Sequence, residues 1–266
     1  MSVLIADTAC VDPNAELADD VEIGPYCVVG PDVKIGAGSR LLAHVCVIGV
    51  TTIGTGNVLS PFCVIGGDPQ DISYRGTPTR VEIGDNNIIR EGVTINRGTE
   101  KEDGLTKIGS NCYLMANAHV AHDCKIGDRV SIANNTMLGG HVHVQSHAIL
   151  SGSVGVHQFV SIGAYSFSGG MSRITHDVPP YMLIDGNPFK VRCINVVGLK
   201  RNGLEHAIDP LHEAHRLIYR AKTTPDQAEV ILESHGNLIP EVASLLAFIR
   251  AQHQGKHGRA REKDRK

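Results

Sequence analysis

The chain contains no tryptophan, and aromatic residues make up only 4% of its 266 residues. Globular β-sandwiches and barrels usually fill their cores with large aromatic side chains, so this shortage argues against both architectures. Glycine, by contrast, occurs 29 times. A core stacked from isoleucine, leucine and valine, with many tight turns between short strands, is typical of a solenoid.

Long apolar segments are also missing from the sequence. No stretch of about 18 apolar residues runs unbroken, and the start of the chain lacks a basic segment followed by a short apolar region. We therefore expect neither a membrane-spanning helix nor a signal peptide. With 42% hydrophobic and 20% charged residues, the composition predicts an ordinary cytoplasmic protein.

The net charge is only −3, which argues against a general nucleic-acid binder. Basic residues are concentrated in the tail over residues 256–266, which we expect to be frayed. The seven cysteines show no regular C-x-x-C spacing, so neither a disulfide framework nor a zinc site is indicated. We predict reduced core thiols at the four cysteines that occupy a small inward position of the repeat described next: Cys27, Cys63, Cys112 and Cys124.

An aliphatic residue at every sixth position is the dominant feature of the sequence. Glycine or alanine often follows it, and a small or branched residue lies four positions after it. Two interruptions separate the runs, and Ser168 breaks the pattern near its end. The aliphatic positions are Ile5, Val11, Leu17, Ile23, Val29, Ile35, Leu41, Val47, Ile53, Leu59, Ile65, Ile83, Ile89, Ile95, Ile108, Leu114, Val120, Ile126, Ile132, Leu138, Val144, Leu150, Val156, Ile162 and Ile174.

A unit of this kind fits a short parallel strand followed by a tight turn, and three units make one triangular coil of about 18 residues. Adjacent coils then stack at about 4.8 Å. We therefore predict a mainly β protein, a parallel β-helix of hexapeptide repeats over residues 1–187. The polar residues 66–80 and 97–107 leave the pattern and are predicted to form inserted loops. Each loop is either a lid that contacts substrate or a tolerated insertion.

From about residue 188 the hexad gives way to helical periodicity, which predicts a C-terminal α-helical domain over residues 188–266. One helical face is formed by Leu204, Ile208, Leu211 and Ile218. A second helix is predicted to start at Thr224, because Pro225 and Gln227 follow as in a capping box. A third helix is predicted from about Pro240 to Gln252.

Fourteen histidines are present, and most occupy outward or helix-surface positions that solvation alone explains. His122 and His141 differ, because the repeat places them at the same corner of adjacent coils. His119 lies just before this pair, and His157 lies on the next coil. The sequence therefore predicts one edge of the prism that is lined with histidines.

Two neighbours of these histidines indicate a chemistry. Asp123 adjoins His122 and could orient it as a general base, and the backbone N–H of Gly140 could stabilise an oxyanion. Acyl transfer to a hydroxyl requires this set of groups. No serine or cysteine lies against His122 in this register, so direct attack by the acceptor is favoured over a covalent acyl-enzyme.

Two other classes of function stay open. The same kind of solenoid occurs in carbonic anhydrases that hold zinc through three histidines. Those enzymes pair two histidines five residues apart in the sequence, and no two histidines here have that spacing. We therefore predict no metal and no cofactor, with a zinc enzyme and a scaffold without chemistry as the alternatives.

Six motifs run through both halves of the sequence: Asn117-Ala-His-Val-Ala-His-Asp-Cys124, Gly139-Gly-His141, Val156-His-Gln-Phe159, Asp177-Val-Pro-Pro-Tyr181, Gly186-Asn-Pro188 and Gly198-Leu-Lys-Arg201. Together they resemble the UDP-N-acetylglucosamine O-acyltransferases of lipid A biosynthesis, and the likeness covers essentially the whole chain. The related N-acyltransferases carry an extra N-terminal domain, whereas the hexads here begin at Ile5. The resemblance implies a left-handed β-helix and a homotrimer with its active sites between neighbouring subunits.

The resemblance also implies the reaction, which is transfer of a 3-hydroxyacyl chain from acyl carrier protein to the 3-hydroxyl of UDP-N-acetylglucosamine. His122 would be the general base, Asp123 its orienting partner and the Gly140 N–H the oxyanion donor. Gly170 would set the end of the acyl groove, and a glycine there implies a long chain. The other residues that the resemblance implies in substrate binding are Gln70, Asp71, His119, His141, His157, Gln158, Asn195 and Arg201.

Acyl carrier protein is acidic, so a basic face on the C-terminal helices and tail should attract it. This predicted face consists of Lys200, Arg201, Arg216, Arg220, Lys222, Arg250, Lys256 and Arg259.

Four positions depart from the family pattern. Ser73 stands where a lysine usually follows the Gln-Asp pair, and Asn96 replaces a histidine. Val197 stands at a usual glutamate, and Asn202 replaces the second of two arginines. Fewer cations would then face the diphosphate, so a 3-amino analogue of the sugar, acylated on nitrogen, is the alternative acceptor.

Overall fold

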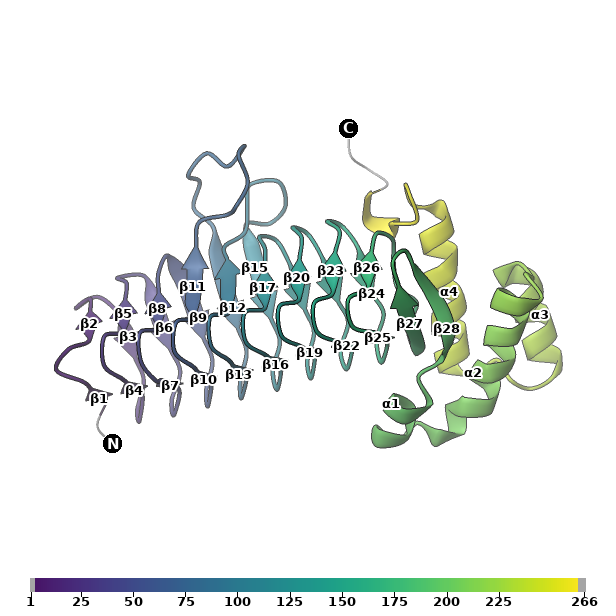
Figure 1. Ribbon diagram of the computed structural model, residues 1–266, viewed down its shortest axis with the longest axis horizontal. Coiled ribbons are helices and arrows are strands. Elements are labelled where there is room, and N and C mark those ends of the chain that lie inside the picture. The colour runs from purple at the N-terminus through teal and green to yellow at the C-terminus, as the bar shows by residue number, and fades with distance from the viewer. Residues whose placement is uncertain (1–2, 263–266) are drawn as a thin grey trace.

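The computed structural model describes residues 3–262 and shows a long three-sided prism that ends in a group of helices (Figure 1). The first strands lie at one end of the prism, and the helices lie at the other. The chain winds around the long axis, so each side of the prism is one sheet of short strands. The mainly β solenoid with a C-terminal α-helical region is therefore confirmed.

Up to β26, each of the three sheets collects every third strand, and the first sheet then adds β27 and β28. The first sheet contains β1 (Leu4–Ile5), β4 (Glu22–Ile23), β7 (Arg40–Leu41), β10 (Val58–Leu59), β13 (Ile88–Ile89), β16 (Tyr113–Leu114), β19 (Ser131–Ile132), β22 (Ile149–Leu150), β25 (Phe167–Ser168), β27 (Met182–Gly186) and β28 (Phe189–Ile194). The second contains β2 (Cys10–Val11), β5 (Val28–Val29), β8 (Cys46–Val47), β11 (Val64–Gly67), β14 (Thr94–Asn96), β17 (His119–Val120), β20 (Met137–Leu138), β23 (Gly155–Val156) and β26 (Arg173–Ile174). The third contains β3 (Glu16–Leu17), β6 (Val33–Ile35), β9 (Val50–Ile53), β12 (Arg80–Ile83), β15 (Leu105–Ile108), β18 (Lys125–Ile126), β21 (His143–Val144) and β24 (Ser161–Ile162).

Strand pairing repeats with the period of one coil. Leu4 pairs in parallel with Glu22, and the same offset of 18 residues recurs along the prism. From Ile23 to Ile174 the aliphatic residue of each hexad is buried, and Ile23, Ile65 and Ile132 are all at most 2% exposed. Ile5, at the open end of the prism, is 47% exposed. The predicted hexads are therefore confirmed, and columns of stacked aliphatic side chains form the core of the prism.

Two polar loops leave the prism at the predicted places (Figure 1). The first, residues 68–79, joins β11 to β12, and the second, residues 97–104, joins β14 to β15. Both are shorter than the predicted spans, because the flanking strands extend further than two residues. Arg97 pairs with Asp68 and Lys101 pairs with Asp71, so the two loops contact each other and form one wall beside the prism.

The predicted domain boundary between residues 187 and 188 falls inside an antiparallel hairpin. β27 ends at Gly186, and β28 returns along it from Phe189 to Ile194. This hairpin extends the first sheet beyond the last coil, so the β region continues to Ile194. The hexad pattern ends near residue 188 because the chain changes there from parallel coils to this hairpin. The helical region begins after the hairpin.

The helical region contains α1 (Val196–Arg201), η1 (Glu205–Ala207), α2 (Ile208–His215), the π-helical turn η2 (Arg216–Arg220), α3 (Pro225–Ser234), α4 (Pro240–Gln254) and η3 (Ala260–Glu262). The predicted start of α3 is confirmed: the Thr224 hydroxyl accepts the Gln227 N–H, and the Gln227 side chain accepts the Thr224 N–H. Leu211, Leu245 and Leu246 are fully buried in a second core between these helices. The C-terminal helices are therefore a separately packed layer on the end of the prism.

The tail is ordered where a frayed end was expected. Residues 256–262 fold back onto the last coils of the prism, and Arg259 is only 7% exposed. The Asp177 carboxylate accepts the backbone N–H of Ala260, which anchors the returning segment. The prediction of a frayed tail was wrong for these residues, because buried acceptors on the prism supply partners that tail composition does not reveal. The predicted tail residues 263–266 lie outside the described residues.

The inward cysteines behave as predicted. Cys27, Cys63, Cys112 and Cys124 are buried and free. Burial raises the pKa of the Cys63 and Cys124 thiols to about 12, so both stay protonated at neutral pH. Within residues 3–262, no helix has the length and apolar character that crossing a bilayer would need.

The capping box of α3 gives a test of how the helical region is stabilised. Thr224→Ala should lower the free energy of unfolding by about 1 kcal/mol, because the Gln227 N–H at the start of α3 loses its side-chain acceptor. Thermal unfolding measures the change. Thr223→Ala, which leaves the capping box intact, is the matched control and should have less than half the effect.

Candidate active site

His122 and Asp123 form a hydrogen-bonded pair at a corner of the prism. The corner follows β17, and Asp123 adopts a left-handed backbone conformation with φ of 62°. The Asp123 Oδ2 lies 2.8 Å from the His122 Nδ1. A carboxylate at Nδ1 holds the proton there and leaves Nε2 as the basic nitrogen. The pair therefore has the geometry of an oriented general base.

Asp123 is the most highly connected group of this corner. It is fully buried, and its carboxylate accepts the backbone N–H of Thr99 at 2.8 Å and the Thr99 hydroxyl at 2.6 Å. Burial alone would raise the pKa of Asp123, but the hydrogen bonds from His122 and Thr99 outweigh burial and hold this pKa below its usual range. The carboxylate is therefore ionised when it orients the imidazole.

His141 occupies the equivalent corner one coil later, as predicted. Its ring meets the His122 ring edge-on with centroids 5.1 Å apart and stacks on Phe159 at 4.2 Å. The His141 Nε2 lies 3.7 Å from the Asp123 Oδ2, and Nδ1 lies 3.1 Å from the Glu102 Oε1. His141 is 1% exposed and packs against the buried side of the His122–Asp123 pair, whereas His122 lines the open groove.

Gly140 lies directly beneath the His122 ring. A Cβ at this position would lie 2.5 Å from the His122 Cε1 and 2.7 Å from Nε2, so any other residue would displace the imidazole. The Gly140 N–H forms no hydrogen bond to other residues within 3–262. A free N–H beside a basic nitrogen is suited to stabilise an oxyanion.

A groove of about 540 Å³ runs from this corner along the second sheet, over β17, β20, β23 and β26. Six of the residues predicted for the site line it: His122, Gly140, Gln70, His119, His157 and Gln158. Asp71 is not a lining residue, but its Oδ2 lies 4.0 Å from the His122 Nε2. The hydrogen bond from Lys101 is the main cause that lowers the pKa of Asp71, so this carboxylate is ionised. Burial lowers the pKa of His119, which keeps that imidazole neutral at neutral pH.

Three predicted residues lie away from the groove of this chain. Asn195 caps α1, with its amide oxygen accepting the Gly198 N–H and its NH₂ donating to the Tyr165 carbonyl. Arg201 is exposed in the last turn of α1. Gly170 lies at an exposed corner near the C-terminal end of the prism and is not a lining residue of the groove. Their roles in binding stay predictions.

Three contributing residues were missed by the sequence analysis. Thr99 holds the Asp123 carboxylate, Glu102 faces His141, and the Arg261 guanidinium contacts both Glu102 and the His141 carbonyl. Thr99 and Glu102 lie in the second loop, which the sequence did indicate as a candidate lid. For Arg261 the sequence contained no signal, because only the folded-back tail brings it to the corner.

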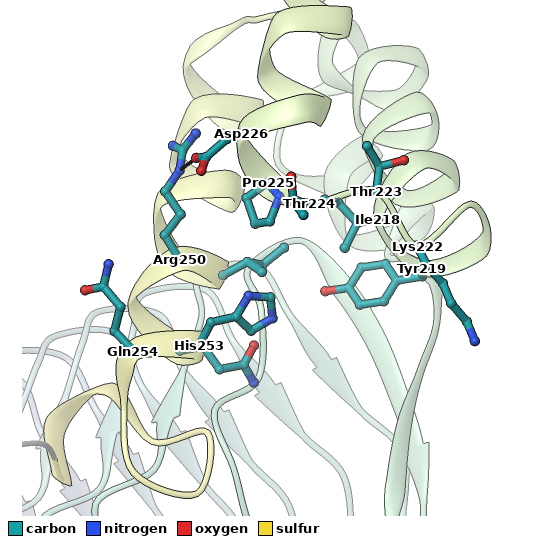
Figure 2. A pocket seen from close by; sticks show the side chains of 12 residues that line it. Ile218, Tyr219, Lys222, Thr223, Thr224, Pro225, Asp226, Arg250, His253 and Gln254 are labelled. Atoms are coloured by element: carbon teal, nitrogen blue, oxygen red, sulfur yellow. Dashed lines mark hydrogen bonds and ion pairs between the residues drawn. The ribbon is translucent and has the colours of Figure 1, made fainter.

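A second cavity, of about 700 Å³, lies between the C-terminal helices (Figure 2). Tyr219 and His253 point toward it, while Arg250 is held at its rim by Asp226 and Glu229. It contains no carboxylate-oriented imidazole comparable to His122. Of these two cavities, the groove at the prism corner is the one that holds an oriented imidazole.

His122, Asp123 and His141 also approach each other closely enough for a shared metal, with one ligand atom of each within 4.8 Å of the others. The His122 Nδ1 and the Asp123 carboxylate, however, already form a 2.8 Å hydrogen bond. Zinc ligands instead converge on a common point about 2 Å from each atom. The donor set therefore fits a hydrogen-bonded base better than a metal centre.

Comparison with known proteins identifies the family of this chain. Residues 177–257 match the family model for domain 2 of UDP-N-acetylglucosamine O-acyltransferases, and residues 105–140 match the model of bacterial transferase hexapeptide repeats. The chain is 46% identical over 253 residues to the acyl-[acyl-carrier-protein]--UDP-N-acetylglucosamine O-acyltransferase of Syntrophobacter fumaroxidans, with 94% of this chain and 98% of the relative covered.

The chain belongs to the UDP-N-acetylglucosamine O-acyltransferase family. The solved structure of the Bacteroides fragilis UDP-N-acetylglucosamine acyltransferase superimposes with a TM-score of 0.89 at 37% identity, covering 93% of this chain and 97% of that one. The Moraxella catarrhalis UDP-N-acetylglucosamine O-acyltransferase gives a TM-score of 0.86 at 43% identity, with 91% and 95% covered. These matches, together with the hexapeptide repeats, make the prism a left-handed β-helix.

The Thr99 hydroxyl gives a test of the Asp123 cluster. Thr99→Val keeps the shape of the side chain but removes one donor to a buried carboxylate, and such bonds to charged groups contribute about 1.5–3 kcal/mol. We expect acyltransferase turnover to fall by about tenfold or more. Steady-state kinetics of the folded variant measure it.

Thr106→Val is the matched control, because the Thr106 hydroxyl accepts the backbone N–H of Asp123 and does not contact the carboxylate. It should cost clearly less turnover than Thr99→Val. Equal losses in the two variants would contradict a specific role of the carboxylate bond.

Proposed function

We propose that this chain transfers a 3-hydroxyacyl group from acyl carrier protein to the 3-hydroxyl of UDP-N-acetylglucosamine, the first step of lipid A biosynthesis. One observation carries the proposal: the His122–Asp123 pair stands over the free Gly140 N–H at the end of an open groove. Relatives at 46% and 45% identity are named for the same donor and acceptor. The reaction needs no metal and no cofactor.

In the proposed mechanism, the His122 Nε2 takes the proton from the sugar 3-hydroxyl as its oxygen attacks the thioester carbonyl. Asp123 holds the opposite nitrogen and stabilises the imidazolium that forms. The carbonyl oxygen gains negative charge in the tetrahedral intermediate, and the Gly140 N–H donates a hydrogen bond to it. Collapse of the intermediate expels the thiolate, which receives the proton from His122. The new ester bond joins the acyl group to the sugar, and the general base returns to its starting state.

The groove of one chain contains only some of the residues proposed to bind the substrates. Gln70, His119, His157 and Gln158 face the groove from the same chain. Asn195 and Arg201 do not, and we propose that a neighbouring subunit supplies the nucleotide contacts in a homotrimer. The exposed guanidinium of Arg201 is available for such a contact, whereas the Asn195 side chain is already used as a helix cap.

The donor is proposed to dock on the C-terminal helices, with complementary charge speeding the encounter. Two members of the predicted basic face are less suited to this role than the others. Arg250 is paired with Asp226 and Glu229, and Arg259 is buried against the prism. The exposed cations Lys200, Arg201, Arg216, Arg220, Lys222 and Lys256 therefore make up the proposed docking face.

A 3-amino sugar acylated on nitrogen is the second candidate acceptor. At three of the four positions that depart from the family pattern, the side chain forms a hydrogen bond within the chain. Ser73 donates to Asp71, Asn96 donates to the Asp68 carbonyl, and Asn202 contacts His147. None of them adds a cation for the diphosphate. The fourth, Val197, is 58% exposed and carries no charge.

The reaction itself is tested by incubating the protein with 3-hydroxyacyl carrier protein and UDP-N-acetylglucosamine, followed by mass spectrometry of the nucleotide sugar. A parallel incubation with the 3-amino analogue separates ester from amide formation. We propose a cytoplasmic site of action.

His122→Ala should lower turnover by about 10²–10⁴, the usual contribution of a general base. His122→Gln is the control for shape, because it keeps a polar side chain without a titratable nitrogen, and it should lose activity to a similar extent. Activity of either folded variant within threefold of wild type would remove His122 from the mechanism.

The proposed role of Gly170 is to leave room for the end of a long acyl chain. A side chain can be added here, since its Cβ would lie 3.4 Å from the nearest atom, the Gly152 carbonyl oxygen. Gly170→Met should shift donor preference to shorter chains and leave turnover with the shortest donor nearly unchanged. A donor panel of graded length measures this, and an unchanged ranking would show that the chain ends elsewhere.

A further inference from the structure

The C-terminal segment, residues 256–262, returns from α4 to the catalytic end of the groove. Its anchor is Asp177, which is 1% exposed and accepts the backbone N–H groups of Ala260 at 2.8 Å and Ser161 at 2.7 Å. The Arg259 guanidinium donates to the Thr175 carbonyl at 2.6 Å. These bonds fix the segment against the last coils. They therefore also determine the position of Arg261, which follows Ala260.

Arg261 joins the two elements that enclose the catalytic carboxylate. One guanidinium nitrogen donates to the His141 carbonyl oxygen, and another lies 3.0 Å from the Glu102 Oε1. His141 belongs to the prism corner, and Glu102 belongs to the second loop. The same loop carries Thr99, which donates twice to Asp123. Arg261 therefore links the prism to the loop that completes the Asp123 site.

Acidic and basic side chains alternate along this path. The Asp123 carboxylate faces the His141 Nε2 at 3.7 Å, the His141 Nδ1 faces Glu102 at 3.1 Å, and Glu102 pairs with Arg261. Burial would raise the pKa of Glu102, but His141 and Arg261 outweigh burial and hold it below its usual range. Glu102 is thus an ionised, partly exposed group that faces both His141 and Arg261.

We infer that Arg261 and Glu102 are positioning residues, which hold the second loop and His141 in register so that Thr99 and His141 keep Asp123 aligned on His122. The inference rests on the proposed function for its catalytic consequence. Neither residue lines the groove, so neither should contact the sugar or the acyl chain. Loss of either should therefore lower kcat and leave the KM for the sugar nucleotide nearly unchanged.

The experiment compares Arg261→Gln, Glu102→Gln and the double variant with wild type in the full chain. Each single variant should lower kcat by about tenfold with KM for the acceptor within twofold. Because the two side chains act through one contact, the double variant should be little worse than either single one. Arg261→Lys keeps the charge but cannot bridge both acceptors, so it should recover part of the loss. His257→Asn changes one exposed side chain of the same segment that has no assigned role, and it should change nothing.

Hydrogen exchange of the same variants measures positioning without substrate. Peptides that cover residues 97–105 should exchange about tenfold faster in Arg261→Gln, while the core strands keep wild-type protection. If folded wild-type protein fails to acylate the nucleotide sugar, the proposed function is contradicted. The hydrogen-exchange rates of the variants then still test whether Arg261 positions the second loop.

Two results would overturn the positioning role: exchange of the second loop and kcat both within twofold of wild type in Arg261→Gln, or losses that multiply in the double variant. Should Arg261→Gln unfold the tail as a whole, Glu102→Gln carries the test, because Glu102 makes no contact with the Asp177 anchor. A tenfold rise in KM in that variant, with kcat unchanged, would make Glu102 a binding residue and contradict the inference.

Discussion

The closing of each coil after 18 residues is the constraint on which the rest of this structure depends. Backbone hydrogen bonds join each corner to the next, as from the His141 N–H to the His122 carbonyl at 3.0 Å. Side chains at equivalent corners must therefore stack. Asp123, His141 and Phe159 share a left-handed backbone conformation, with φ between 62° and 66°, because they occupy the same corner position in successive coils. The repeat thus supplies a rigid support on which an imidazole can be placed within hydrogen-bond reach of a carboxylate.

The candidate active site also depends on the two places where the repeat is interrupted. Partners on β9 and β12 lie 30 residues apart, and those on β12 and β15 lie 25 apart, yet all three strands keep the register of the third sheet. The additional residues leave the prism as loops without disturbing the core. The second loop then returns over the corner and delivers both donors of Thr99 to Asp123. Rigid coils position the base, and an insertion completes its surroundings.

A carboxylate buried at a prism corner needs hydrogen-bond donors to offset the loss of its hydration. Asp123 is fully buried, and an unpaired carboxylate there would be strongly unfavourable. Two bonds from Thr99 and one from His122 satisfy its oxygens. Beyond His141, the acidic Glu102 and the basic Arg261 extend the alternation of acidic and basic groups to the C-terminal segment. The proposed catalytic corner is therefore supported by groups from a coil, a loop and the end of the chain.

The sequence by itself determined the elements whose contacts have a fixed spacing along the chain. The hexads predicted the coils, the shared corner predicted that His122 meets His141, and the capping box predicted the start of α3. Only the tertiary structure decided the contacts whose spacing follows no period. Thr99 reaches Asp123 across 24 residues, and Arg261 reaches His141 across 120. A periodic pattern encodes neighbours one coil away, but where a loop or a tail folds back is decided by the buried acceptors that it meets, and those acceptors exist only once the prism has formed.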